Sequence, residues 1–473
     1  MRIEAIGIVA ILIGLVGWMA GPAFSTRAFF VSTLFSSAAA ILLTSLGQAN
    51  VQPAHLLLGF LAVGAVARRE PLRMAGRTLA YPREGFWLAL TAIYAVLSAA
   101  FLPRIFAGTT DVFAIARTQL GTGVMAVPLH PTTGNVTQPI YFAGDVVCFC
   151  LFYAEACKPV GLATVTKAAL LCATVNLVFA AIDVASYLGG LGDLLAVIRN
   201  GDYRMLNEAT VGGFKRIVGS FPEASTFAYY TIGFFAFSTR LWLAGVYLRA
   251  TVPLTLLSFV ALVFSTSSTG YAGTTAFLGA LFLVGFAQML TRPVTRTMLG
   301  FVGLVPAILA VGLLGLRLYP PAWNVLVEMV NQTVFDKLAS SSGVERSLWN
   351  TQALTNFVDT HALGGGVGSV RASSFPVAVL GNVGVIGALT YGLFLLRLFL
   401  VRGDRWAAPF PAACQSAARW ACFAQLAGAS VAGSFIDLGL PFFIFAGLAC
   451  ARPMPLPVAR SAPRQRPLSP AAA

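Results

Sequence analysis

The sequence predicts an all-α polytopic membrane protein with about 12–13 transmembrane helices and an external loop that carries an amphipathic helix. Three observations predict this class. Of the 473 residues, 58% are hydrophobic and only 10% are charged, whereas soluble domains carry about 25% charged residues. Many apolar runs approach 20 residues, about the length that crosses a bilayer as a helix. These runs do not alternate apolar and polar residues, which argues against membrane-spanning strands.

The apolar runs follow one another along a single transmembrane domain, 1–451, with no separate soluble domain and no tandem repeat. No cleavable signal peptide is evident, because the first apolar run is followed directly by further spans. The spans are expected at 4–22, 28–46, 53–67, 86–103, 138–157, 168–187, 223–246, 251–265, 271–290, 298–317, 376–400, 411–430 and 438–451.

Basic residues in the short connections predict the orientation, because such residues favour the cytoplasmic side. Alternation of the spans places all of these connections on one side, which is therefore expected to be cytoplasmic. The tail 452–473, rich in Pro, Ala and Arg, is expected to be disordered and cytoplasmic. The formal net charge of +14 thus reflects orientation and not a nucleic-acid partner. The orienting residues are Arg68, Arg69, Arg73, Arg77, Arg83, Lys158, Lys167, Arg292, Arg296, Arg402 and Arg405.

Three longer polar segments are expected on the opposite side, near 104–137, 188–222 and 318–375. The last two carry cations against the orienting bias, which suggests that they bind an anionic group. All seven cysteines fall in or beside apolar runs, so neither a disulfide nor a zinc site is expected. The cations of these segments are Arg199, Arg204, Lys215, Arg216, Arg317, Lys337, Arg346 and Arg371.

The first polar cluster is FKRIVGSFPEAS, residues 214–225, where Lys215 and Arg216 precede a span and Glu223 stands at its mouth. One interpretation is a site for an anionic substrate. The alternatives are an ordinary helix N-terminus for Glu223 and a snorkelling or headgroup-binding side chain for Arg216.

The second cluster is VERSLWNTQALTNFV, residues 344–358, which predicts an amphipathic helix along the membrane surface with Arg346 and Trp349 on one face. In the THALGGGVGS stretch that follows, the glycines either let the backbone approach a ligand or form an irregular turn. His361 is a candidate base or an ordinary structural histidine. Arg371 stands just outside the next span, so the loops can bring it together with Arg216 and Arg346. Such forked guanidinium groups suit a pyrophosphate.

These stretches resemble the O-antigen ligase and polymerase superfamily, the Wzy-type enzymes of bacterial inner membranes. That family shows an Arg and a Trp, a Gly-rich turn, and then a span with G-x-x-G near its start, as in VERSLWNTQALTNFVDTHALGGGVGSV followed by LGNVGVIGALTYGLFLL. RIVGSFPEAS is similar to the upstream R-x-x-G-x-F segment. STSSTGYAG, residues 265–273, is similar to a serine-rich turn, with Ser268 in place of the usual arginine. The positions that carry the resemblance are Arg346, Trp349, Gly364, Gly366, Gly368, Gly384 and Gly387.

The resemblance implies glycosyl transfer from a sugar chain on undecaprenyl pyrophosphate to a hydroxyl of the next lipid-linked repeat unit. Arg216, Arg346 and Arg371 would neutralise the departing pyrophosphate. The candidates for the base that takes the acceptor proton are Glu223, Glu345 and His361. The expected substrate-binding residues are Lys215, Arg204, Trp349, Gly366 and Gly368.

No metal-binding D-x-D sequence stands in the external segments, so neither a metal nor another cofactor is expected. The expected partners are the bilayer, the undecaprenyl-pyrophosphate-linked oligosaccharide, a chain-length regulator and a flippase for lipid-linked sugars. A ligase is the first alternative, but ligases usually carry a histidine where Ser373 and Ser374 stand here. A transporter or flippase would draw on Asp145 and Asp183 inside spans. A structural subunit of an export complex is the third alternative.

Overall fold

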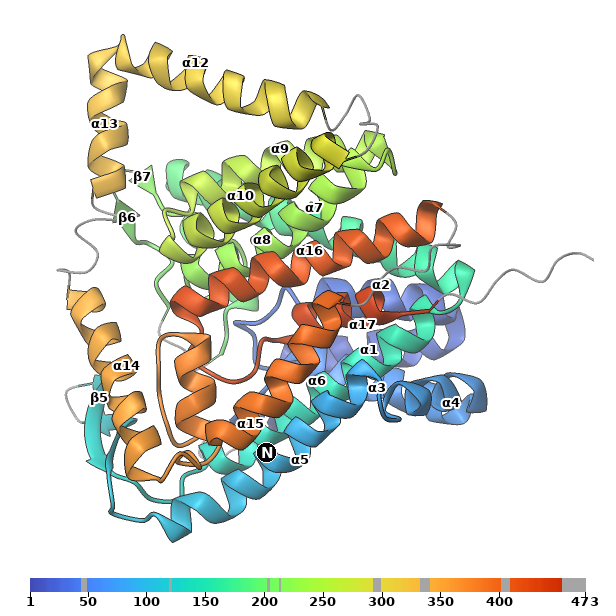
Figure 1. The fold of residues 1–473 in the computed structure, drawn as a ribbon. Helices are drawn as coiled ribbons and strands as arrows, with labels where there is room; N and C mark the ends of the chain where they lie inside the picture. Colours follow the sequence, from blue (N-terminus) through green and yellow to red (C-terminus); the bar gives the residue numbers. More distant parts are fainter. Residues whose placement is uncertain are drawn as a thin grey trace, which may run out of the picture.

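A computed structural model of the chain describes residues 1–43, 49–118, 121–201, 205–211, 214–291, 299–331, 341–400 and 409–452. These parts are mostly helical, and the long helices cross one another in a bundle (Figure 1). Five helices in the described ranges are long and apolar enough to cross a membrane, in agreement with the helical membrane class that composition predicts. They are α5 (Glu84–Ile105), α6 (Gly134–Ala156), α7 (Pro159–Leu188), α10 (Ser268–Thr291) and α15 (Phe375–Leu400).

The other helices are shorter or less apolar, and they complete the bundle or lie at its edges. Two of the longer ones, α8 (Ala224–Leu243) and α16 (Pro409–Ala432), pack on each other near the middle of the molecule. The rest are α1 (Ala5–Ala20), α2 (Pro22–Ser32), α3 (Pro53–Ala67), α4 (Arg69–Thr78), α9 (Leu248–Phe264), α12 (Val305–Arg317), α13 (Pro320–Val330), α14 (Ser341–Asp359) and α17 (Leu440–Cys450), with a 3₁₀ turn at Ala196–Ile198 and a π turn at Gly300–Leu304.

The span expected at 28–46 is wrong as a single helix, because α2 ends at Ser32 and the following residues are irregular. The backbone there finds partners in a remote loop. The Ser37 carbonyl accepts a hydrogen bond from the Gly201 N–H (2.9 Å), and the Ala39 N–H donates one to Asn200 Oδ1 (3.0 Å). Backbone groups satisfied by other segments do not need a helical ladder.

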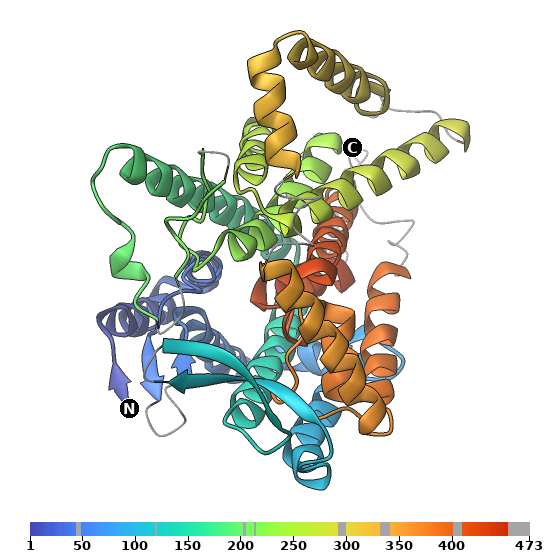
Figure 2. The ribbon, with the colours of Figure 1, turned by 90° about the vertical axis from the view of Figure 1, so that its left-hand side faces the viewer.

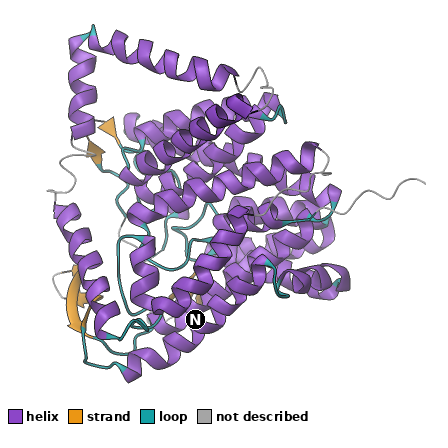
Figure 3. Cartoon of the chain, in the orientation of Figure 1, coloured by secondary structure: helices purple, strands orange, loops and turns teal. Residues whose placement is uncertain are grey.

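Outside the long helices, three small antiparallel sheets occur among the described residues, and the strands at the edge of the molecule are orange in Figure 3. The longest strands form a hairpin in which Asp111 faces Pro128. The residues of this hairpin lie in the polar segment 104–137, which was expected to be a loop. The three sheets are β1 (Arg2–Ile3) with β2 (Ile41–Leu43) and β3 (Ala49–Val51), β4 (Asp111–Thr118) with β5 (Gly121–Pro128), and β6 (Thr210–Val211) with β7 (Phe214–Lys215).

The three long polar segments gather on one face of the molecule. This face is on the left in Figure 1 and towards the viewer in Figure 2, and it carries β4–β5, β6–β7, α13 and α14. Helix α4 lies towards the opposite side (Figure 1). Residues 453–473 of the expected tail lie outside the described residues.

Helix α17 is the centre of the core, because every one of its residues is buried, and it packs on α6 and α16. It is preceded by the non-helical residues 433–439. Two tyrosines donate hydrogen bonds to carbonyls of this break: Tyr229 to Leu438 (2.6 Å) and Tyr391 to Ile436 (3.2 Å). Within a bilayer, irregular backbone is stable only where protein covers and pairs it in this way.

Candidate functional site

Three arginines expected to bind an anion converge on the face that carries the polar segments. Arg216 directly follows β7, Arg346 lies in the second turn of α14, and Arg371 lies between α14 and α15. Glu223 directly precedes α8, at the mouth of that helix as expected. The charge of Glu223 acts on both Arg216 and Arg371, that of Arg346 acts on Arg216, and that of Glu345 acts on Arg371. We call these five residues the arginine cluster.

The guanidinium group of Arg216 is fixed by the turn between α9 and α10. Its Nε donates a hydrogen bond to Thr266 Oγ1 (3.0 Å), and its Nη2 donates one to the Thr266 carbonyl (3.2 Å). Thr266 has a positive φ of 44°, a conformation that non-glycine residues seldom adopt. Thr266 was not predicted as a site residue, although it belongs to the serine-rich stretch 265–273.

The guanidinium group of Arg371 is fixed by α14. It stacks on the ring of Trp349, with 4.3 Å between Cζ and the ring centroid. Two residues after Arg371, the backbone N–H of Ser373 donates a hydrogen bond to Asn350 Oδ1 (2.8 Å). This bond ties α14 to the segment before α15. The Nε of Arg371 is buried and has no hydrogen-bond partner among the described residues.

The cluster has three cations and only two carboxylates, and burial makes this excess of positive charge unfavourable. Burial lowers the pKa of Arg216, while Glu223 opposes this change and Arg346 adds to it. Burial likewise lowers the pKa of Arg371, opposed by Glu345 and Glu223. Guanidinium groups still stay charged near neutral pH. An anion that enters the cluster would therefore relieve both the loss of solvation and the repulsion between cations.

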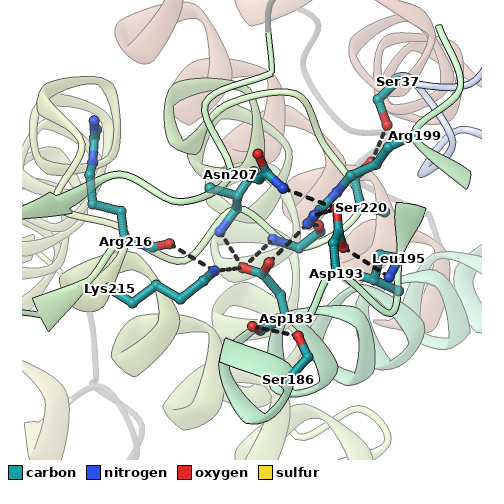
Figure 4. Close-up of polar contacts among 12 residues, drawn as sticks. Ser37, Asp183, Ser186, Asp193, Leu195, Arg199, Asn207, Lys215, Arg216 and Ser220 are labelled. Atoms are coloured by element: carbon teal, nitrogen blue, oxygen red, sulfur yellow. Dashed lines mark hydrogen bonds and ion pairs between the residues drawn. The ribbon is translucent and has the colours of Figure 1, made fainter. Parts of the chain in front are cut away.

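Lys215 is not available to a substrate, contrary to the prediction from sequence, because it forms a buried ion pair (Figure 4). Its Nζ lies 2.7 Å from Asp183 Oδ2, and the two side chains are only 5% and 3% exposed. The other oxygen of Asp183 lies 2.9 Å from Arg199 Nη2, and Arg199 also pairs with Asp193 at 2.7 Å. Buried charges need such partners.

The same carboxylate also fixes the backbone that follows Arg216. The N–H groups of Val218 and Gly219 donate hydrogen bonds to Asp183 Oδ2, at 3.0 and 3.2 Å. Asp183, near the C-terminal end of α7, therefore positions the arginine through its neighbours in the chain. The isolated acid expected inside a span is a structural anchor for the site.

His361 lies away from the arginine cluster and does not fit the predicted role of base. It follows the C-terminal end of α14, whereas Arg346 lies near the beginning of that helix. The thirteen steps of helix from Arg346 to Asp359 correspond to about 20 Å. The His361 side chain is exposed and contacts the ring of Phe106 edge-on, with 6.1 Å between centroids.

The glycines after α14, predicted to bind substrate, stand where the chain packs closely on other segments. Gly366 and Gly368 both have a φ of +90°, and a Cβ on either would come within 3 Å of other atoms, from Pro103 and Gly134 respectively. Asn382 of α15 holds this turn, because its Oδ1 accepts a hydrogen bond from the Gly368 N–H (3.1 Å). The sequence predicted the turn but not the close packing that requires it.

The remaining predicted substrate-binding residue, Arg204, lies outside the described residues.

A second polar group lies inside the bundle, near the break before α17. The carboxyl group of Asp145 in α6 is buried and lies within hydrogen-bonding reach of Asp437. The charge of Asp437 also acts on His55 in α3. Asp145 could be recognised from the sequence as an acid inside a span, but Asp437 was not predicted. The sequence around Asp437 shows only that it stands between two short apolar runs.

The arginine cluster combines fixed cations and two carboxylates, and the helix that carries Arg346 is apolar on its other side. Val344, Leu348 and Val358 of α14 are 49%, 55% and 69% exposed, and helical spacing places them together on the face opposite Arg346. Such a site can hold a phosphorylated head group whose lipid tail stays in the bilayer.

No model of a known protein family matches the chain, and no curated protein shows significant similarity to it.

Proposed function

We propose that this protein is a polymerase of a bacterial surface polysaccharide, such as an O-antigen, a capsule or an exopolysaccharide. It would join undecaprenyl-pyrophosphate-linked repeat units by metal-independent glycosyl transfer. In this proposal the chain crosses the inner membrane about 12–13 times, with its long loops periplasmic and its C-terminus cytoplasmic. A chain-length regulator and a flippase for lipid-linked sugars are the proposed partners.

The convergence of Arg216, Arg346 and Arg371 is the observation that supports this proposal best. When the acceptor oxygen attacks the anomeric carbon of the donor, the bond to the lipid pyrophosphate breaks and negative charge grows on the departing phosphate oxygens. Cations that are already in place stabilise that charge without reorganisation. The partly buried guanidinium groups supply such cations.

The carboxylates of the cluster are suited to take the proton of the acceptor hydroxyl. Glu223 is the stronger candidate, because it acts on two of the arginines and its Oε1 already accepts a hydrogen bond from Ser225. Glu345 is the second candidate. A positioned base contributes roughly 100- to 10,000-fold to such a reaction.

The test is chain growth by the purified protein in detergent, with lipid-linked repeat units as the only sugar source and a chelator present. A ladder of longer chains is the expected product. Arg216→Ala and Arg346→Ala should each lower the rate by about 100-fold or more. Arg317→Ala is the matched control, since Arg317 also stacks on a tryptophan, Trp323, with 5.0 Å to the ring centroid, but outside the cluster.

The products also distinguish the alternatives. A ligase would transfer a finished chain once to lipid A or to a protein and would form no ladder. A flippase would move the lipid-linked sugar and leave its length unchanged, and the Asp145–Asp437 pair inside the bundle is the feature that favours this second candidate. An intact ladder in both arginine variants would contradict the assignment of the site.

A further inference from the structure

A groove far from the arginine cluster has the properties of a lipid site. It lies between α1, α2 and α3, has a volume of about 460 Å³ and is mainly apolar. Small-molecule sites range from about 300 to 1,000 Å³. Gly14 and Gly17 of α1 form part of its wall, and Arg68 stands at the end of α3, next to Trp18.

The length of the groove matches one leaflet of a bilayer. Its lining runs along α3 from Leu57 to Arg68, eleven steps of helix or about 16 Å. Half of a hydrocarbon core is about 15 Å. A single acyl chain that enters beside Arg68 would therefore be enclosed along about the whole depth of its leaflet.

The helix next to the mouth of the groove carries positive charge. Arg69, Arg73 and Arg77 follow at intervals of four residues on α4 and are exposed, so they form one stripe. The opposite face of α4 is apolar and packed, with Met74 and Ala75 buried. Figure 1 shows α4 beside α3. A basic helix of this kind attracts anionic lipid head groups.

We propose that the groove holds one acyl chain of an anionic phospholipid and that the stripe on α4 binds its phosphate. The two observations are independent, because the groove selects a hydrocarbon chain and the stripe selects a negative head group. This site does not depend on the arginine cluster and would exist whatever reaction the cluster performs.

The test uses the full chain in a non-ionic detergent after lipids have been washed away. Phosphatidylglycerol or phosphatidylcholine is then titrated, and bound lipid is counted by native mass spectrometry. We expect phosphatidylglycerol to bind at least about tenfold more tightly than phosphatidylcholine, because each arginine near an anionic lipid contributes roughly fivefold. The triple variant Arg69→Gln, Arg73→Gln and Arg77→Gln should lose that preference.

Two glycines of α3 provide a matched pair for the groove itself. Gly64 lines the groove, and a Cβ there would make only ordinary contacts with Trp18 and Arg68, at 3.6 and 3.7 Å. Gly59 faces open space. Gly64→Leu should abolish binding of both lipids, whereas Gly59→Leu should bind like the wild type. Equal affinity of the wild type for the two lipids, or unchanged binding by Gly64→Leu, would overturn the proposal.

A second measurement keeps the test decisive if Gly64→Leu does not fold. Trp18 lines the groove, so brominated chains of phosphatidylglycerol should quench a fluorescence component that is lost in Trp18→Phe. Equal quenching by brominated phosphatidylcholine would overturn the proposal. A dimer that Gly64→Leu converts to monomers without a change in lipid binding would instead show that a second copy covers this face.

Discussion

Arg371 shows how one side chain combines charge with shape. Its planar guanidinium group stacks on Trp349 at 4.3 Å, which a lysine ammonium group cannot reproduce, because it is a compact point charge. We expect Arg371→Lys to slow chain growth by about ten- to a hundredfold, with little change in the thermal unfolding temperature. Initial rates of chain growth would measure this. Arg317→Lys, beside Trp323, should leave the rate unchanged, and a wild-type rate in Arg371→Lys would contradict the role of the stack.

The sequence could predict the arginines of the cluster, but not what holds them. Arg216, Arg346 and Arg371 are recognisable because they stand outside the apolar runs and against the orienting bias. The pairing of Lys215 with Asp183 joins residues far apart in the chain, and hydrophobic periodicity carries no information about such pairings. His361 belongs to the same polar segment as Arg346, but most of α14 separates the two residues in space.

Helix α7 anchors the segment 189–222 through a single carboxylate. Asp183→Asn would leave Arg199 and Lys215 buried with too little negative charge, which typically costs about 3–5 kcal/mol. The free energy of unfolding, measured by thermal or denaturant unfolding, should fall accordingly. The control is Glu155→Gln, which breaks a half-exposed pair with Lys158 at 3.5 Å that contributes about 0–1 kcal/mol. Similar losses in the two variants would contradict the anchoring role.

Elements defined by long apolar runs could be predicted from the sequence, and so could α14 from its amphipathic spacing. The break after α2 and the hairpin β4–β5 could not. In the first case the backbone partners are Asn200 and Gly201. In the second, Asn356 of α14 donates a hydrogen bond to Thr110 Oγ1 (2.8 Å) next to β4, a contact between distant segments. Local preference is overridden where remote partners satisfy the backbone.

On the scale of the whole molecule, the two faces should meet different compartments. All seven cysteines are buried and should stay silent towards a membrane-impermeant maleimide. Ala107, between α5 and β4, and Gly76 of α4 are exposed, and the hairpin β4–β5 and α4 lie on opposite faces (Figure 1). We expect Ala107→Cys to react in intact spheroplasts and Gly76→Cys only after lysis. The reverse pattern would contradict the periplasmic placement of the arginine cluster.

Neighbouring cations in the stretch Lys215–Arg216 point in different directions, one towards Asp183 in the interior and the other towards Thr266 at the cluster (Figure 4). Exchanging the two residues, as Lys215→Arg with Arg216→Lys, would preserve composition, net charge and mean hydropathy. It would nevertheless place a planar guanidinium group in the buried site beside Asp183 that now holds an ammonium group. At the cluster, a phosphate would meet a lysine, which cannot donate two parallel hydrogen bonds as an arginine does. Composition and charge therefore do not reveal which cation pairs with Asp183 and which one reaches the cluster. The order of Lys215 and Arg216 in the chain decides this.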